Sequence, residues 1–166
     1  RGGVGMADLL THVLVAYVVA TGLSLLDGRV TPAAVTLAMV GGLLPDLNRV
    51  GLLLPASTVS GTVGVPFSWD PLGTVGGVTV AVTAAALLVP PRRRRLTVAM
   101  LALGVASHFL LDYLLLFPSG YAHPYLWPVT TRALPGPDLY LSSDRWPAAL
   151  AVVGATLARG VAWRRR

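Results

Sequence analysis

The sequence predicts an all-α fold: a polytopic membrane helix bundle of about five transmembrane helices, with a broken second helix and one domain over residues 1–166. Composition and hydropathy predict it. Of the 166 residues, 54% are hydrophobic and only 12% are charged, which is about half the charged share of a soluble domain. The mean hydropathy is +0.69, and the apolar residues gather in runs that suit a hydrocarbon core about 30 Å thick.

Five apolar runs define the expected helices on a window of about 19 residues. They cover approximately residues 9–26, 33–54, 73–90, 96–117 and 147–163. The second run contains Gly41, Gly42 and Pro45. Because proline removes a backbone donor, we expect this helix to be kinked or broken, or to form a re-entrant pair. The last run is the weakest because it contains Arg159, although an arginine near a helix end can reach the interface.

The arginines predict the orientation of the bundle. Seven of the 13 lie in two blocks, Arg92–Arg95 and Arg164–Arg166, each beside an apolar run. With the N-terminus outside, both blocks and Arg29 are cytoplasmic, as the excess of positive charge in cytoplasmic loops requires. We therefore expect a multi-pass plasma-membrane protein with a cytoplasmic C-terminus, in contact with membrane lipids and other membrane subunits. Nucleic acid is not expected as a partner, because a basic face on a soluble domain is missing.

Four histidine and aspartate residues fall inside the apolar runs, and ionisable residues there are costly in a membrane and commonly functional. They are His12, Asp46, His108 and Asp112. His108 and Asp112 are spaced i, i+4 and therefore share one helix face. At about 1.5 Å per residue, all four lie in the outer half of the membrane in this topology. Imidazole and carboxylate groups that converge predict a metal site, whereas the absence of cysteine excludes thiolate ligands.

Other interpretations of these residues stay open. A buried histidine that is hydrogen-bonded to a carboxylate for structural reasons also satisfies the i, i+4 spacing. Gly41 and Gly42 fit close helix packing, and Pro45 fits a plain kink, but a kink alone does not explain the Asp that follows it. The external segment 118–137 contains His123, a further candidate metal ligand. Its aromatic residues fit an interfacial belt, and its Gly and Pro residues favour an ordered cap or lid.

Short motifs carry these residues in a fixed order. They read Met6-Ala-Asp-Leu-Leu-Thr-His12, Gly42-Leu-Leu-Pro-Asp-Leu-Asn48, Ser107-His-Phe-Leu-Leu-Asp112 and Tyr125-Leu-Trp-Pro128. In these motifs the chain resembles the YdjM-type family of predicted membrane-bound metal-dependent hydrolases, over most of residues 6–128. The resemblance implies a polytopic membrane protein in which His12, Asp46, His108 and Asp112 are the metal ligands.

The chain departs from that family's pattern at two places. The family usually has a second acid two residues after the aspartate of the Pro-Asp pair, where this chain has Asn48. It also commonly has a His-rich element before the third helix, where this chain has Phe67-Ser-Trp-Asp-Pro-Leu-Gly-Thr74 without histidine. Asp70 lies there, at the outer end of the third helix, and is the candidate substitute as ligand or general base.

Three functions remain in competition. The first is a metal-dependent hydrolase with an outward-facing site, in which a divalent ion, zinc before manganese or iron, acts on an ester or phosphodiester of a lipid-like substrate. The second is a non-catalytic membrane subunit or scaffold, whose His/Asp cluster is a structural polar network or a structural metal site. The third is a small transporter with a broken helix at its binding site, which the absence of an internal repeat disfavours.

Overall fold

The computed structural model describes residues 6–117, 124–132 and 134–165, and within them the chain is helical without a β-strand. The elements in chain order are α1 (Met6–Ser24), α2 (Pro32–Gly41), the 3₁₀ helix η1 (Leu44–Leu52), α3 (Ala56–Val63), the 3₁₀ helix η2 (Asp70–Gly73), α4 (Val75–Leu87), α5 (Pro91–Tyr113) and α6 (Trp146–Arg164). One isolated bridge joins Leu115 and Tyr140. The prediction of an all-α fold is confirmed.

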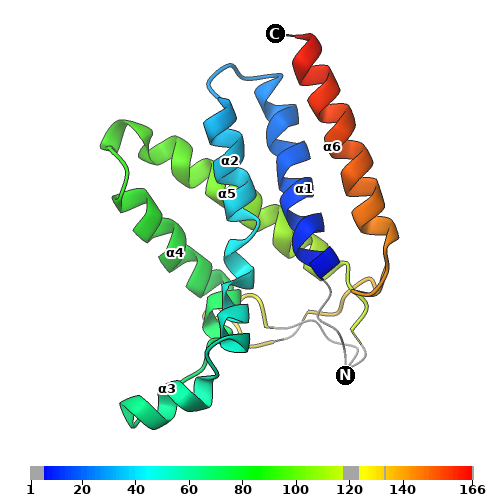
Figure 1. Ribbon diagram of the computed structural model, residues 1–166. Helices are drawn as coiled ribbons and strands as arrows, with labels where there is room; N and C mark the ends of the chain where they lie inside the picture. Colours follow the sequence, from blue (N-terminus) through cyan, green and yellow to red (C-terminus); the bar gives the residue numbers. More distant parts are fainter. Residues whose placement is uncertain (1–5, 118–123, 133, 166) are drawn as a thin grey trace.

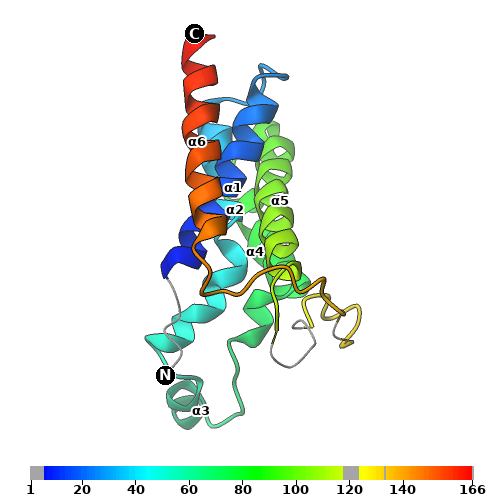
Figure 2. The ribbon, with the colours of Figure 1, turned by 90° about the vertical axis from the view of Figure 1, so that its right-hand side faces the viewer.

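Helix α1 lies at the centre of the bundle. It contacts α2, α5 and α6, while α4 packs against the other side of α5. The α1–α2 connection, the α4–α5 turn and the C-terminal end of α6 lie toward one end of the bundle, the upper end in Figure 1. We name this the arginine end, since it carries Arg29, Arg92–Arg95 and Arg164–Arg165. The start of α1, η1, η2 and the end of α5 lie at the opposite end, which we name the histidine end, and α3 projects below it (Figures 1 and 2).

The second predicted run is broken, and the structure shows how. Helix α2 ends at Gly41, and the chain continues after a turn as η1, with Pro45 in its first turn. A Cβ on Gly104 of α5 would meet the backbone of α2, at the carbonyl oxygen of Ala38 and the amide of Gly42. A Cβ on Gly41 would likewise meet the backbone of Leu101. The glycines therefore bring α2 and α5 into backbone contact, and the proline ends the regular helix.

Helix α5 begins earlier than expected, at Pro91 rather than at residue 96. Proline suits the first turn of a helix, because its missing amide proton would have no intrahelical acceptor there. The block Arg92–Arg95 therefore continues the helix instead of forming a turn before it. At the other end α5 stops at Tyr113, so residues 114–117 of the predicted run lie outside the helix.

Two helices, α5 and α6, are long and apolar enough to cross a membrane, compared with the five runs expected. The apolar parts of α1 (Leu9–Ser24), α2 and α4 are shorter. The difference has a physical cause in the second and third runs. The second run counted η1 as part of the helix, and the third run counted Gly73 and residues 88–90. In the structure, α2 ends at Gly41 and α4 covers only Val75–Leu87.

Candidate metal centre

His12, His108 and Asp112 form a compact group at the histidine end. His12 comes from α1, while His108 and Asp112 come from successive turns of α5. One ligand atom from each residue lies within 4.8 Å of the other two. The two histidine side chains are 1% and 2% exposed, and the Asp112 side chain is 16% exposed. The group is therefore almost closed to solvent, and the carboxylate is its most accessible member.

Asp112 bridges the two histidines. Its Oδ1 lies 3.3 Å from Nε2 of His12, and its Oδ2 lies 3.1 Å from Nε2 of His108. The two imidazole rings are stacked, with centroids 3.8 Å apart and an angle of 17° between their planes. In this stacked arrangement both Nε2 atoms face the same carboxylate. Two cationic rings at this separation would repel each other, so the carboxylate between the Nε2 atoms is the negative charge that compensates them.

The break after α2 orients His108. Nδ1 of His108 donates a hydrogen bond to the carbonyl oxygen of Gly42, at 2.7 Å. Because α2 ends at Gly41, this carbonyl lies in the turn before η1 and is available to an external donor. A neutral histidine that donates from Nδ1 keeps a lone pair at Nε2, which then faces Asp112. A backbone carbonyl behind the ring is the usual support of a histidine that ligates a metal through Nε2.

The group opens on a cavity of about 490 Å³. His108 and Asp112 form one wall of this cavity. The other walls come from η1, η2, the turn before α4 and the segment after α5: Pro45, Asp46, Asn48, Arg49, Asp70, Gly73, Thr74, Leu115, Phe117, Pro124 and Tyr125. The candidate group therefore lies at the floor of a cavity large enough for a phosphate group with part of a substrate attached.

Asp46 lies on the cavity wall but outside the three-residue group. Its Oδ1 is paired with Nε of Arg49 at 2.6 Å, one turn along η1. Its Oδ2 is buried and has no hydrogen-bond partner among the residues the structure describes. Asp46 was expected as a fourth ligand, and the structure instead shows its carboxylate shared between an arginine and the cavity.

Asp70, the expected base, also lines the cavity. Its Oδ2 accepts a hydrogen bond from the Ser68 hydroxyl at 2.7 Å, and its backbone amide donates to the same hydroxyl. Trp69 anchors this turn by donating from its indole nitrogen to the carbonyl of Leu54. The remaining predicted ligand, His123, lies outside the described residues.

Sequence reasoning missed several cavity residues. Arg49 was not among the candidates, although its i+3 spacing from Asp46 signals an ion pair within one helical turn. The Gly42 carbonyl is a backbone group, so no residue type in the sequence marks it as a hydrogen-bond partner. Only the predicted break in the second helix points to it. Thr74 caps α4 by accepting from the amide of Gly77, and Tyr125 contacts α5 through Phe109 at a ring separation of 5.6 Å.

The donor set fits a divalent transition metal. Bonds of about 2.0–2.2 Å from a tetrahedral zinc separate its nitrogen and oxygen ligands by about 3.4 Å. The two distances from Asp112 to the histidines, 3.3 and 3.1 Å, are close to that value. Two imidazoles and one carboxylate suit zinc, and also iron or manganese. His12, His108 and Asp112 can therefore hold a metal ion.

Comparisons with known proteins do not identify the chain: no family model, no curated protein and no solved structure matches it.

Proposed function

We propose that this chain is a multi-pass membrane protein whose His12, His108 and Asp112 hold a catalytic divalent metal, with zinc preferred. The proposed reaction is hydrolysis of an ester or phosphodiester in a lipid-like substrate. The resemblance of its motifs to the YdjM-type family supports the same reaction class. The observation that carries the proposal is the buried group of three possible protein ligands, beside a cavity whose wall also contains Asp46, Arg49 and Asp70.

Exposed apolar side chains support the membrane location. On α6, Leu150 is 63% exposed, Val153 57% and Leu157 64%, and on α4 Val80 is 69% exposed. A soluble protein rarely leaves a continuous apolar helix face in water. Lipid, in contrast, satisfies such a face and allows the charged residues to gather at the two ends of the bundle.

The arrangement of the ends supports the orientation with the N-terminus outside. Three segments separate in the sequence bring their arginines to the arginine end (Figure 1), as a cytoplasmic side requires. The chain contains no cysteine, so single-cysteine variants test this directly. We expect a membrane-impermeant maleimide to label Ser142→Cys on intact cells and Gly28→Cys only after permeabilisation. The reverse pattern contradicts the orientation, and labelling of both on intact cells contradicts the bundle.

Three protein ligands leave one position of a tetrahedral ion open, which is the pattern of catalytic rather than structural zinc sites. In such a site the metal supplies a water of lowered pKa and an electrophile for the scissile group. Asp70 faces the same cavity and is the proposed general base, with Oδ1 available because Oδ2 accepts from Ser68. Arg49 on the adjacent wall supplies positive charge for an anionic substrate.

Metal analysis of the purified protein tests the proposal. We expect about one zinc per chain in the wild type and a large loss in His108→Ala. Asp138→Asn is the matched control, because Asp138 is an exposed acid that lies outside the cavity lining. Hydrolysis of a chromogenic phosphodiester is then expected in the wild type, lost in His108→Ala and after chelation. A wild-type protein without stoichiometric metal would falsify the hydrolase.

A structural polar network is the second candidate. The distances from Asp112 to His12 and His108 are also hydrogen-bond distances, and the network joins α1 to α5. This function predicts no stoichiometric metal and no turnover, but a loss of stability in His108→Ala. Thermal unfolding of the metal-free wild type and His108→Ala, measured side by side, separates the two: equal midpoints without metal contradict the network.

A further inference from the structure

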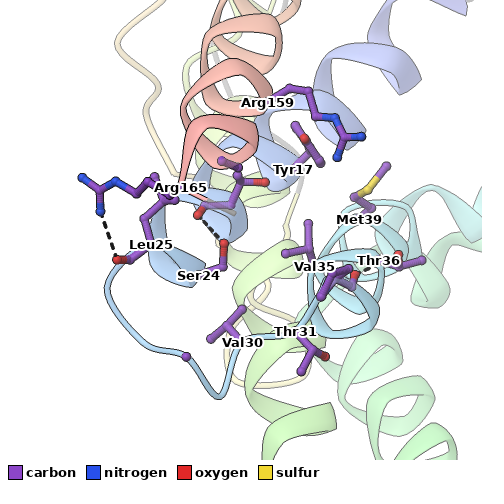
Figure 3. Close-up of a pocket in the computed structure, with 14 residues that line it drawn as sticks. Tyr17, Ser24, Leu25, Val30, Thr31, Val35, Thr36, Met39, Arg159 and Arg165 are labelled. Carbon is purple, nitrogen blue, oxygen red and sulfur yellow. Dashed lines mark hydrogen bonds between the residues drawn. The ribbon is translucent and has the colours of Figure 1, made fainter.

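The arginine end contains a second cavity, separate from the candidate metal centre. Its volume is about 590 Å³, and it lies between α1, the α1–α2 connection, α2 and the last turns of α6. Figure 3 shows Arg159 reaching from α6 past Tyr17 on the side of Met39, with Arg165, Ser24 and Leu25 on the other side. Its described lining contains two arginines and no acid.

The positive charge of Arg159 has no counter-charge in this part of the fold. Within residues 6–117, 124–132 and 134–165, Arg159 makes no ion pair and no side-chain hydrogen bond. Asp27 is the acid at the arginine end among the described residues. Both of its carboxylate oxygens accept hydrogen bonds from Arg29, at 2.9–3.1 Å. Arginines within candidate membrane spans are commonly paired, and an anion bound in this cavity would supply the counter-charge of Arg159.

A buried hydroxyl also lines the cavity. Thr21 is 4% exposed, and its Oγ1 has no hydrogen-bond partner among the described residues. Unpaired buried hydroxyls are costly, and Thr21 is one of the residues that line the cavity. The Tyr17 hydroxyl and the Ser24 hydroxyl lie on the same lining, and Ser24 donates to the carbonyl of Thr21 while keeping its acceptor lone pairs. Two arginines and several hydroxyls together suit the oxygens of a phosphate group.

The remaining lining is apolar, which distinguishes a lipid from a free anion. Val30 and Val35 belong to the buried core, and Met39 and Leu25 continue the apolar wall. Arg159 lies six residues before Arg165, about 9 Å deeper along α6. Arg165 donates from Nη1 to the carbonyl oxygen of Leu25, on the opposite side of the cavity from the Arg159 guanidinium (Figure 3). A phosphate held by Arg159 would lie at the depth of lipid headgroups, with the apolar wall beside the first part of an acyl chain.

We propose that this cavity binds one anionic phospholipid through its headgroup phosphate, with Arg159 as the principal contact and Arg165, Thr21 and Tyr17 around it. The site rests on the proposed membrane location but not on the metal centre or on hydrolysis. This site differs from general attraction of the arginine blocks to a charged membrane surface, because a single cavity predicts one lipid bound per chain.

Native mass spectrometry of the full chain tests this proposal. Detergent-solubilised protein is titrated with phosphatidylglycerol, with phosphatidylcholine and with inorganic phosphate. We expect one phosphatidylglycerol retained per chain and weaker retention of phosphatidylcholine. Inorganic phosphate at the same concentration should displace neither. Equal retention of both lipids contradicts the site while leaving the membrane location intact, and displacement by inorganic phosphate shows that the cavity takes a free anion and overturns the lipid assignment.

Variants then locate the binding. Arg159→Ala is expected to weaken phosphatidylglycerol binding by about tenfold or more, as loss of a charge-assisted contact predicts. Arg145→Ala is the matched control, since it removes the same charge from the other end of α6 and should leave binding unchanged. Equal affinities in Arg159→Ala and wild type overturn the proposal.

Two milder variants keep the test valid if Arg159→Ala does not fold. Arg159→Lys retains the charge but cannot form a bidentate contact with phosphate, so we expect an affinity between those of wild type and Arg159→Ala. Thr21→Val preserves the shape of the side chain and removes the unpaired hydroxyl. It should weaken binding severalfold, and unchanged binding in both variants contradicts the assigned contacts.

Discussion

The two ends of the bundle handle charge in opposite ways. At the histidine end, acids outnumber arginines on the cavity wall, and the buried His12 and His108 converge on Asp112. At the arginine end, Arg159 and Arg165 line a cavity whose described wall contains no acid. The first end can hold a cation, and we propose that the second holds an anion. The two proposed ligands of opposite charge therefore lie at opposite ends of one bundle. Variants at one end can be compared with the unchanged site at the other.

The largest expected effect is at Asp112, which contacts both histidines. Asp112→Asn removes the negative charge and one ligand, so we expect zinc affinity to fall by more than about 100-fold, beyond the loss typical of an outer-shell change. Competition with a chromogenic chelator measures it, with Asp138→Asn as control. Phosphatidylglycerol binding at the arginine end should not change. Wild-type zinc affinity in Asp112→Asn would exclude this carboxylate as a ligand.

Asp70 should separate chemistry from binding. As a general base it contributes about 100-fold or more to the rate, so Asp70→Asn should lower kcat by that amount while zinc content stays at the wild-type level. The readout is the initial rate of phosphodiester hydrolysis at saturating substrate, measured beside the zinc content of the same preparation. If Asp70→Asn instead loses its zinc, Asp70 is a ligand rather than a base.

Gly104 allows the close contact between α5 and the end of α2. A Cβ in Gly104→Ala would meet backbone atoms of Ala38 and Gly42, which side-chain rotation cannot relieve. We expect a loss of about 1–3 kcal/mol in the free energy of unfolding, measured by denaturant titration in detergent. Gly22→Ala is the control, because nothing lies within 4 Å of its Cβ position and helix propensity alone predicts a gain of up to about 1 kcal/mol. Equal stability of the two variants contradicts the close packing.

The smallest effect concerns Asp27, whose pairing leaves Arg159 without an acid. Hydrogen bonds from the Arg29 side chain hold the pKa of the exposed Asp27 carboxyl below its ordinary value of 3.8. Because the pKa is lowered, the stabilisation is present above pH 3.8 and is lost as the pH falls through the lowered value. NMR titration of labelled aspartate should show Arg29→Ala raising this pKa toward 3.8. An unchanged midpoint would mean that Asp27 is not held by Arg29 and is free to neutralise Arg159.

The sequence predicted the helical class and the positions of the long helices, because apolar runs and proline act locally. It also predicted the three residues that converge, since His108 and Asp112 share a helix face and His12 lies at a similar depth. The i+3 spacing of Asp46 and Arg49 could have predicted their pairing, but the sequence could not show that the Gly42 carbonyl supports His108. That contact follows from how the turn after α2 lies against α5, which depends on residues far apart in the chain. Short elements such as α3 and η2 have no periodic signal long enough to detect.

The distance in sequence between His12 and its two partners has a consequence for biosynthesis. Chains emerge N-terminus first, so His12 is made with the first helix, whereas His108 and Asp112 arrive only with α5. A nascent or truncated chain that ends before α5 holds one of the three ligands and cannot retain the ion. Zinc retained at the proposed site would therefore report that α5 has joined α1, and a chain truncated before α5 should be purified without zinc.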